Sequence, residues 1–298
     1  MTTEFPQPSI LYPDEGNLFE DASILRNAVG FSTKQRAFQA QSLLSPDLEQ
    51  FNEEGLSYAA VNAYCAEMTA AEDVLGWMFA LRDWRPGTSE ASLFAQLGKV
   101  EVGRDPYTEK AAEALLDAID ETGVRKLLHI PTDVELAANG FAEDIRAAVA
   151  DSVTANLGGL QRITRYRLDY DRGYVVGFNN LKHLPLGFPT KMRGKAEVLV
   201  PRWLRKHSSG RPFVVKLDGI HLQNLWIEAS VENVRLMAHR AIISQAVLNC
   251  LLGLILWTRF GEPYETPPWV LYATKLRGWL DDDDVDEAVD TAIEPPIL

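Results

Sequence analysis

The sequence predicts a mainly α fold, a helical bundle with a small β-hairpin insert near 195–228. Apolar residues recur at three- and four-residue spacing over 56–84, 141–183 and 231–259, as on helices that bury one face. Short segments rich in β-branched residues lie between the last two of these stretches. With 298 residues, 46% of them hydrophobic, the chain is long enough to bury a sizeable core.

One helical domain is expected over 21–280, between two ends of different composition. Residues 1–20 are rich in proline and lack periodicity, which predicts an extended N-terminal arm. From Trp279 onward the sequence carries eight acidic residues and no Lys or Arg. A block of one charge sign is typically solvated, so residues 281–298 are expected to form an acidic tail.

The first long helix is expected over 56–84, after two short helices between residues 21 and 50. Its apolar positions recur at helical spacing: Val61, Tyr64, Cys65, Met68, Leu75, Met78 and Leu81. The sequence Arg-Pro-Gly at 85–87 ends this helix, because proline lacks the N–H donor that a helix interior needs.

Two further helices are expected in the middle of the chain. The first lies within 105–123, with Asp105 as its N-cap and Gly123 just beyond its end, since glycine favours the left-handed conformation that follows many helices. The second runs from 141 to 183 and is expected to bend at Gly158 and Gly159.

The helix over 231–259 is expected to be the buried centre of a soluble protein, with Ser230 as its N-cap. Its apolar run, 241–257, is interrupted by polar residues: Ser244, Gln245 and Asn249. At about 25 Å this run is shorter than a bilayer core of roughly 30 Å. No membrane association is therefore expected.

Charge and cysteine content bear on partners and compartment. The net charge is −13, yet residues 161–216 contain thirteen Lys or Arg and only three acidic residues. Cys65 and Cys250 lie far apart inside apolar helical patterns, which favours reduced core residues over a disulfide. Because the N-terminus also lacks a basic region followed by an apolar run, a cytoplasmic protein is expected.

The usual signatures of catalysis and metal binding do not occur. There is no G-x-S-x-G sequence, no H-E-x-x-H sequence and no pair of E-x-x-H sequences, and the five histidines stand apart from one another. Glu67, Glu72 and Asp73 are expected on the solvated face of their helix. No cofactor and no metal site are therefore predicted.

The segment Phe-Asn-Asn-Leu-Lys-His at 178–183 is the first candidate site. Asn179, Asn180, Lys182 and His183 could cap a helix end, where Lys and His satisfy the last carbonyl groups. The same side chains could also bind a ligand or anion, or take part in catalysis. The sequence leaves these alternatives open.

This segment, with the Gly187-Phe188 pair after it, resembles bacterial helical proteins of the HEPN group, found in defence and toxin systems. The resemblance implies a helical nucleotide-binding protein or a ribonuclease. HEPN nucleases carry an Arg followed after four to six residues by a His, at one helix end. Here Arg202 and His207 have that spacing, although Trp203 stands where a polar residue is usual.

A basic region over 182–216 is the second candidate site. This region and the segment before it supply the candidate ligand- or anion-binding residues, which are Asn179, Asn180, Lys182, His183, Arg202, Arg205, Lys206 and Arg211. Aromatic residues, among them Phe188, Trp203 and Phe213, lie between the basic ones. Single-stranded nucleic acid requires both residue types, whereas an acidic protein or the acidic tail requires only the charges. A solvent-exposed hairpin with a few core anchors would carry the same residues without any specific partner.

A third candidate is a set of polar residues on the helix over 231–259: Arg235, His239, Gln245 and Asn249. Buried amides need hydrogen-bonding partners, so Gln245 and Asn249 are expected to bond to each other or to a neighbouring helix. The four residues could instead line a small-ligand cavity.

Together these observations favour a non-catalytic helical interaction or scaffold protein with a basic hairpin surface for an anionic partner. The expected partner is another protein or a second copy of the chain in a homodimer, with nucleic acid as an alternative through 182–216. The alternative function, implied by the HEPN resemblance, is a ribonuclease or nucleotide-binding protein. Its catalytic candidates are Arg202, His207 and His183.

Overall fold

The computed structural model describes residues 16–44, 46–102, 117, 120–169, 178, 188–192, 195–203, 215–217 and 220–260. The chain forms two compact units. Unit 1 comprises residues 1–35, 72–165 and 243–298, and unit 2 comprises residues 36–71 and 166–242. The expected acidic tail lies outside the described residues. Residues 16–20, expected in an extended arm, belong instead to the first helix.

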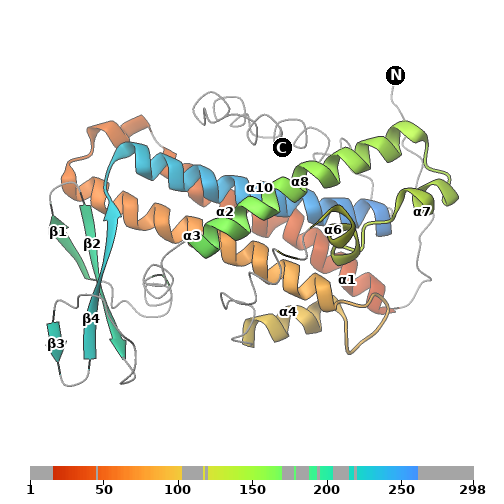
Figure 1. The fold of residues 1–298 in the computed structure, drawn as a ribbon, viewed down its shortest axis with the longest axis horizontal. Helices are drawn as coiled ribbons and strands as arrows, with labels where there is room; N and C mark the ends of the chain where they lie inside the picture. The colour runs from red at the N-terminus through yellow and green to blue at the C-terminus, as the bar shows by residue number, and fades with distance from the viewer. Residues whose placement is uncertain are drawn as a thin grey trace. The chain divides into compact units, whose positions relative to one another are not determined.

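The mainly α prediction is confirmed (Figure 1). Unit 1 contains α1 (Gly16–Asn27), the π-helical turn η1 (Ala28–Ser32), α4 (Leu93–Val102), α6 (Glu121–Leu127), α7 (Asp133–Ala138) and most of α8 (Glu143–Asp169). Both units include parts of α2 (Thr33–Gln41), α3 (Glu53–Asp83) and α10 (Val231–Phe260). Unit 2 adds η2 (Ser42–Leu44), η3 (Pro46–Gln50) and a sheet.

The helices expected over 56–84 and 231–259 are confirmed by α3 and α10. Ser230 caps α10, because its hydroxyl oxygen accepts the backbone N–H of Asn233 at 3.2 Å. α10 is long and apolar enough to cross a membrane, but 78% of its most apolar window is buried within the protein. That degree of burial is typical of the core helix of a soluble protein.

One glycine of α8 has a packing role in addition to the bend that the sequence predicts. α8 runs as one helix through Gly158 and Gly159, and its described part ends at Asp169. A Cβ atom added at Gly159 would lie 2.7 Å from Cγ2 of Val247 on α10. Gly159 therefore allows α8 and α10 to approach each other closely within unit 1.

The expectation that Gly123 ends a helix is wrong, because Gly123 lies inside α6. That helix ends at Leu127, and His129 in the turn that follows has a positive φ of 53°. The N–H of Ile130 donates to the carbonyl of Arg125 at 2.9 Å, and the N–H of His129 donates to that of Lys126 at 3.4 Å. This pattern is a Schellman motif with histidine at the position that glycine usually occupies.

The His129 side chain explains this conformation. Its ring lies 4.9 Å from that of Trp84 in an edge-to-face arrangement, and its Nε2 lies 3.0 Å from the carbonyl oxygen of Leu81 on α3. The Trp84 ring also stacks on Phe260, with 6.3 Å between centroids. The contacts of the His129 ring with Trp84 and with Leu81 thus offset the strain of a left-handed conformation at a residue other than glycine.

The core of unit 2 surrounds the first half of α3. Phe178 is buried against Tyr64 in an edge-to-face contact with 6.3 Å between ring centroids. Ile227 at the end of the sheet and Met237 on α10 belong to the same apolar cluster. Packing around α3 therefore joins the sheet and α10 within this unit.

The four described strands are β1 (Phe188–Met192), β2 (Lys195–Trp203), β3 (Val215–Leu217) and β4 (Ile220–Glu228). They form one antiparallel sheet in the order β1-β2-β4-β3. The sequence predicts one hairpin over 195–228, whereas the sheet begins at Phe188 and its central pair is β2 with β4. Figure 1 shows β4 leading directly into α10.

Candidate functional site

The structure describes only part of the predicted site. Phe178, the first residue of the segment 178–183, is a buried core residue. The candidates Asn179, Asn180, Lys182, His183, Arg205, Lys206, His207 and Arg211 lie outside the described residues. Arg202 lies in strand β2, whereas the HEPN motif places its Arg at a helix end. The Arg202–His207 pair stays a prediction.

The register of the sheet places three basic residues opposite one another on adjacent strands, in one row across the sheet. Arg202 on β2 is paired with His221 on β4, and His221 is also paired with Lys216 on β3. Neighbouring strands lie about 4.8 Å apart, so these three positions span about 10 Å across the sheet. Neither His221 nor Lys216 was a predicted site residue, because sequence spacing alone does not show which strands pair.

Aromatic residues occupy the other face of the same sheet. Successive positions of a strand alternate between faces, so the row next to Arg202, which contains Trp203 and Ile220, belongs to the opposite face. By the same alternation, Phe188 and Trp226 share the face of Trp203. The register therefore separates the basic row from the aromatic positions.

The polar residues of α10 have separate partners. Nη2 of Arg235 lies 3.1 Å from Oε1 of Glu49, in an exposed ion pair of unit 2. In unit 1, Nε2 of Gln245 donates to Oδ2 of Asp73 at 3.0 Å. His239 is buried.

Asn249 also bonds to a neighbouring helix, since the Thr33 hydroxyl donates to its Oδ1 at 2.8 Å. The amides of Gln245 and Asn249 thus each bond to a different helix, α3 and α2 respectively. Such bonds satisfy amides on a helix that is otherwise largely apolar.

Two carboxylates of α3 are buried, and the prediction that they lie on a solvated face is wrong. Glu67 and Glu72, expected on a solvated face, are only 3% and 5% exposed. Within unit 2, Nη1 of Arg240 lies 3.4 Å from Oε1 of Glu67. A buried carboxylate requires such a partner, and the partner is 173 residues away in the sequence. Helical periodicity therefore could not reveal that these residues are buried.

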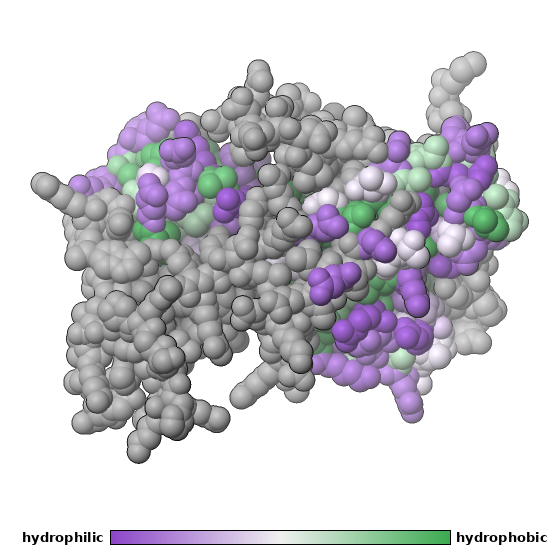
Figure 2. All heavy atoms as spheres, in the orientation of Figure 1, coloured by the Kyte–Doolittle hydropathy of each residue, from purple (hydrophilic) through white to green (hydrophobic). Residues whose placement is uncertain are grey.

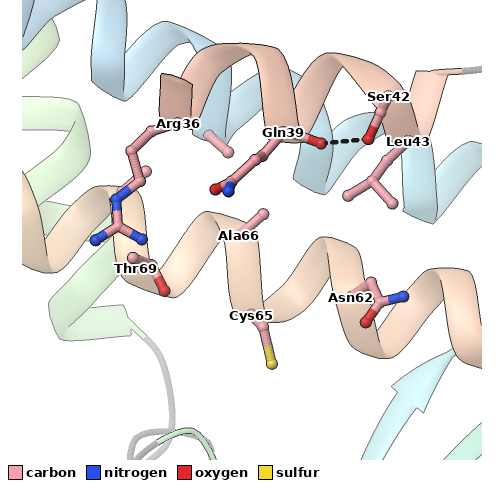
Figure 3. Close-up of a pocket in the computed structure, with 10 residues that line it drawn as sticks. Arg36, Gln39, Ser42, Leu43, Asn62, Cys65, Ala66 and Thr69 are labelled. Carbon is pink, nitrogen blue, oxygen red and sulfur yellow. Dashed lines mark hydrogen bonds between the residues drawn. The ribbon is translucent and has the colours of Figure 1, made fainter. Parts of the chain in front are cut away.

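The sequence did not indicate a hollow in unit 2 between α2 and α3, with a volume of about 350 Å³. It is lined by Arg36, Gln39, Ser42, Leu43, Asn62, Cys65, Ala66, Thr69, Ala70 and Ala241. Figure 3 shows Arg36 and Gln39 extending from α2, with Thr69 beside the guanidinium group and Ala66 below the amide. The spacing of Asn62, Cys65 and Thr69 along one face of α3 was the available signal.

The outer surface of this part of unit 2 is mixed in character. Figure 2 shows hydrophobic residues among hydrophilic ones where η3 and the first turns of α3 lie. Phe38, Phe51 and Tyr58 are exposed. Single exposed aromatic side chains are common on protein surfaces, so these residues do not by themselves mark a binding site.

The two thiols differ in position. Cys250 is 1% exposed in the core of unit 1, and burial raises its pKa. Cys65, expected in the core, is half-buried and lines the hollow, and burial raises its pKa to about 11. Both side chains therefore remain protonated thiols near neutral pH and lack the thiolate character of a catalytic cysteine.

Among the described residues, no group of three or more His, Cys, Asp or Glu side chains is arranged to hold a metal ion. Comparison with known proteins adds no relative: no family model, no curated protein and no solved structure matches this chain.

Proposed function

We propose that this chain is a non-catalytic interaction protein whose basic sheet binds an acidic segment of a protein partner. The observation that carries the proposal is the row Arg202–His221–Lys216, which the register aligns across three strands. Three such positions within about 10 Å match several carboxylates of one extended acidic peptide.

The charge distribution supports an anionic partner. Unit 2 contains 14 Lys or Arg and 11 acidic residues. Unit 1 contains 15 Lys or Arg and 31 acidic residues. Two acidic residues of unit 2, Glu49 and Glu67, are paired with Arg235 and Arg240. Complementary charges increase association rates and select partners more than they increase raw affinity.

The separation of basic and aromatic positions favours an acidic protein over single-stranded nucleic acid. Proteins that bind single strands use basic groups for phosphates and aromatic rings for base stacking along one groove. In this sheet Trp203 and Trp226 lie on the face opposite the row that contains Arg202. An acidic peptide requires the charges alone.

A cytoplasmic location and a homodimeric state are part of the proposal. Both cysteines are free thiols, as expected in a reducing compartment. A homodimer would present two basic sheets to one partner, and two linked sites bind more tightly than one. Sedimentation of the purified chain measures its oligomeric state.

The test is a comparison of two lysine variants in binding to a fluorescent acidic peptide, measured by anisotropy across a salt series. Lys216→Gln removes a charge from the basic row, and Lys195→Gln removes one from the opposite face of the sheet. We expect Lys216→Gln to weaken binding about fivefold, Lys195→Gln to have little effect, and added salt to weaken binding in all three proteins.

Equal loss of affinity in the two variants would show that net charge, and not the row, determines binding. Single-stranded RNA and DNA of matched charge serve as competitors, together with a truncated chain that ends at Trp279. Tighter binding of RNA than of the peptide would reject the acidic-protein partner. Cleavage of the RNA would favour the HEPN-like alternative.

A further inference from the structure

The two outer edges of the sheet differ in the backbone groups that they present. Among the described strands, β1 and β3 each pair on one side only, because the order is β1-β2-β4-β3. Along an antiparallel pair, one residue bonds to the neighbouring strand and the next turns its N–H and C=O groups to the other side. The position of one residue in this alternation therefore determines the positions of all the others.

Two prolines assign the alternation. Proline has no N–H group, so Pro189 on β1 is compatible with an outward-facing position, where no bond to β2 is lost. Pro201 on β2 then faces the side of β1, beyond the end of the described strand, which begins opposite Leu199. With the opposite alternation, both prolines would interrupt the ladder of hydrogen bonds. The two positions thus indicate the same pattern.

This pattern places the backbone of Lys216 at an open edge. Arg202 bonds to His221, so the residues on either side of His221 bond to β3. Their partners are Val215 and Leu217, and the N–H and C=O groups of Lys216 between them face away from β4. The edge of β3 therefore presents a donor and an acceptor in the same row as the basic residues.

The edge of β1 is less suited to a further strand. Its outward-facing positions are Pro189 and Lys191, and the first of these has no donor. Proline at an outward-facing position is one device by which natural sheets avoid pairing with other chains. Of the two edges, β3 is therefore the one that can accept a partner.

We propose that the acidic partner segment adds to the sheet as an antiparallel strand along β3. This inference rests on the proposed function and specifies how the basic sheet binds its partner. An added strand lies about 4.8 Å beyond β3, and its residue opposite Lys216 continues the row of Arg202 and His221. An acidic residue at that position is a cross-strand neighbour of Lys216, and opposite charges at such positions stabilise a sheet.

The register also determines the sequence pattern of the partner. Val215 and Leu217, on either side of Lys216, are apolar and belong to the opposite face of the sheet. The partner therefore carries apolar residues opposite them, so that acidic and apolar residues alternate along its strand. Lys216 exchanges both backbone bonds with the residue directly opposite, so the acidic residues direct their N–H groups towards β3.

The first test compares peptides of equal charge in binding to the wild-type protein, measured by fluorescence anisotropy. Glu-Val-Glu-Val-Glu-Val-Glu alternates, whereas Glu-Glu-Glu-Glu-Val-Val-Val has the same composition in blocks. We expect the alternating peptide to bind about fivefold more tightly, because only this peptide matches the two faces of the added strand.

N-methylation of the alternating peptide tests the backbone bonds. N-methyl groups on three Glu residues block N–H groups that face β3, and binding should weaken about tenfold. N-methyl groups on the three Val residues face away from β3 and should have little effect. Equal effects of the two modifications would overturn the added strand.

The outcomes distinguish this inference from the proposed function. Equal binding of the alternating and block peptides would reject the added strand, while the charged sheet would still bind acidic segments. Absence of binding by both peptides at low salt would reject the added strand and the proposed function together.

Proline variants test the same edge in the protein. Lys216→Gln and Lys216→Pro lack the same charge, but only the proline variant also lacks the outward-facing N–H group. The sheet already accommodates proline at such an edge position, at Pro189. With unchanged circular dichroism, Lys216→Pro should bind the alternating peptide about fivefold more weakly than Lys216→Gln does.

The matched control lies on the other edge. Lys191→Pro and Lys191→Gln change an outward-facing position of β1 and should bind the alternating peptide alike. Equal binding by Lys216→Pro and Lys216→Gln would overturn the proposal.

Discussion

Units 1 and 2 use their polar side chains differently. In unit 1 the Asp21 carboxylate accepts the Trp84 indole N–H at 2.8 Å and the Leu93 backbone N–H at 2.7 Å, both in the interior. In unit 2 polar side chains of α2 and α3, such as Gln39 and Asn62, line an open hollow. Interior polar contacts join helices of unit 1, whereas these polar groups of unit 2 are exposed at the surface.

The largest effect on stability is expected at Asp21. Asp21→Ala would leave two buried donors without their acceptor, which should lower the free energy of unfolding by about 3 kcal/mol. Urea denaturation measures the change. Asp21→Asn retains an acceptor oxygen and should cost less. Asp47→Ala, at an exposed position of unit 2, should change stability by less than about 0.5 kcal/mol.

Alanine substitutions at two glycines of unit 1 compare an interior position with a surface position. Gly159→Ala places a methyl group against Val247 and should destabilise the protein by about 1–3 kcal/mol. Gly98→Ala, on α4 with no atom within 4 Å of the added Cβ, should stabilise it by about 0.5–1 kcal/mol. Effects of the same sign at the two sites would contradict the close approach of α8 and α10.

His129 should make the stability of unit 1 depend on pH. Burial lowers the pKa of His129 below its usual 6.5, and the charges of Arg259 and Arg85 lower it further, against the hydrogen bond to Leu81. The unfolded chain thus takes up this proton at a higher pH than the folded chain does. The contribution of neutral His129 to the free energy of unfolding is therefore complete above about pH 6.5 and falls as the pH decreases below that value.

The measurement is the difference in unfolding free energy between the wild type and His129→Asn from pH 8 to pH 5. Asparagine tolerates the left-handed conformation but does not titrate. The difference should narrow or reverse as the pH falls. A difference that is constant over this range would show that His129 titrates alike in both states.

The smallest effect is expected in unit 2, at the ion pair of Arg235 with Glu49. Its side chains are 39% and 68% exposed, so water and salt screen the attraction. Arg235→Ala should change the free energy of unfolding by less than about 1 kcal/mol. A loss comparable to that of Asp21→Ala would remove the distinction between the two units.

The candidate site was only partly predictable from the sequence. The excess of basic residues over 161–216 is a property of composition and could be counted directly. The row formed by Arg202, His221 and Lys216 depends on the pairing of β2, β4 and β3, which a linear pattern does not specify. The hollow depends on the approach of α2 to α3, two helices that sequence periodicity treats separately.

The amino-acid sequence by itself determined the long helices α3 and α10 and the cap at Ser230, because periodicity and capping act over a few neighbouring residues. Only the tertiary structure decided that Glu67 is buried beside Arg240, since these partners are distant in sequence. The same holds for Gly159, which permits a close helix contact. Local patterns determine the elements, whereas long-range packing decides which side chains are buried and which side chains meet.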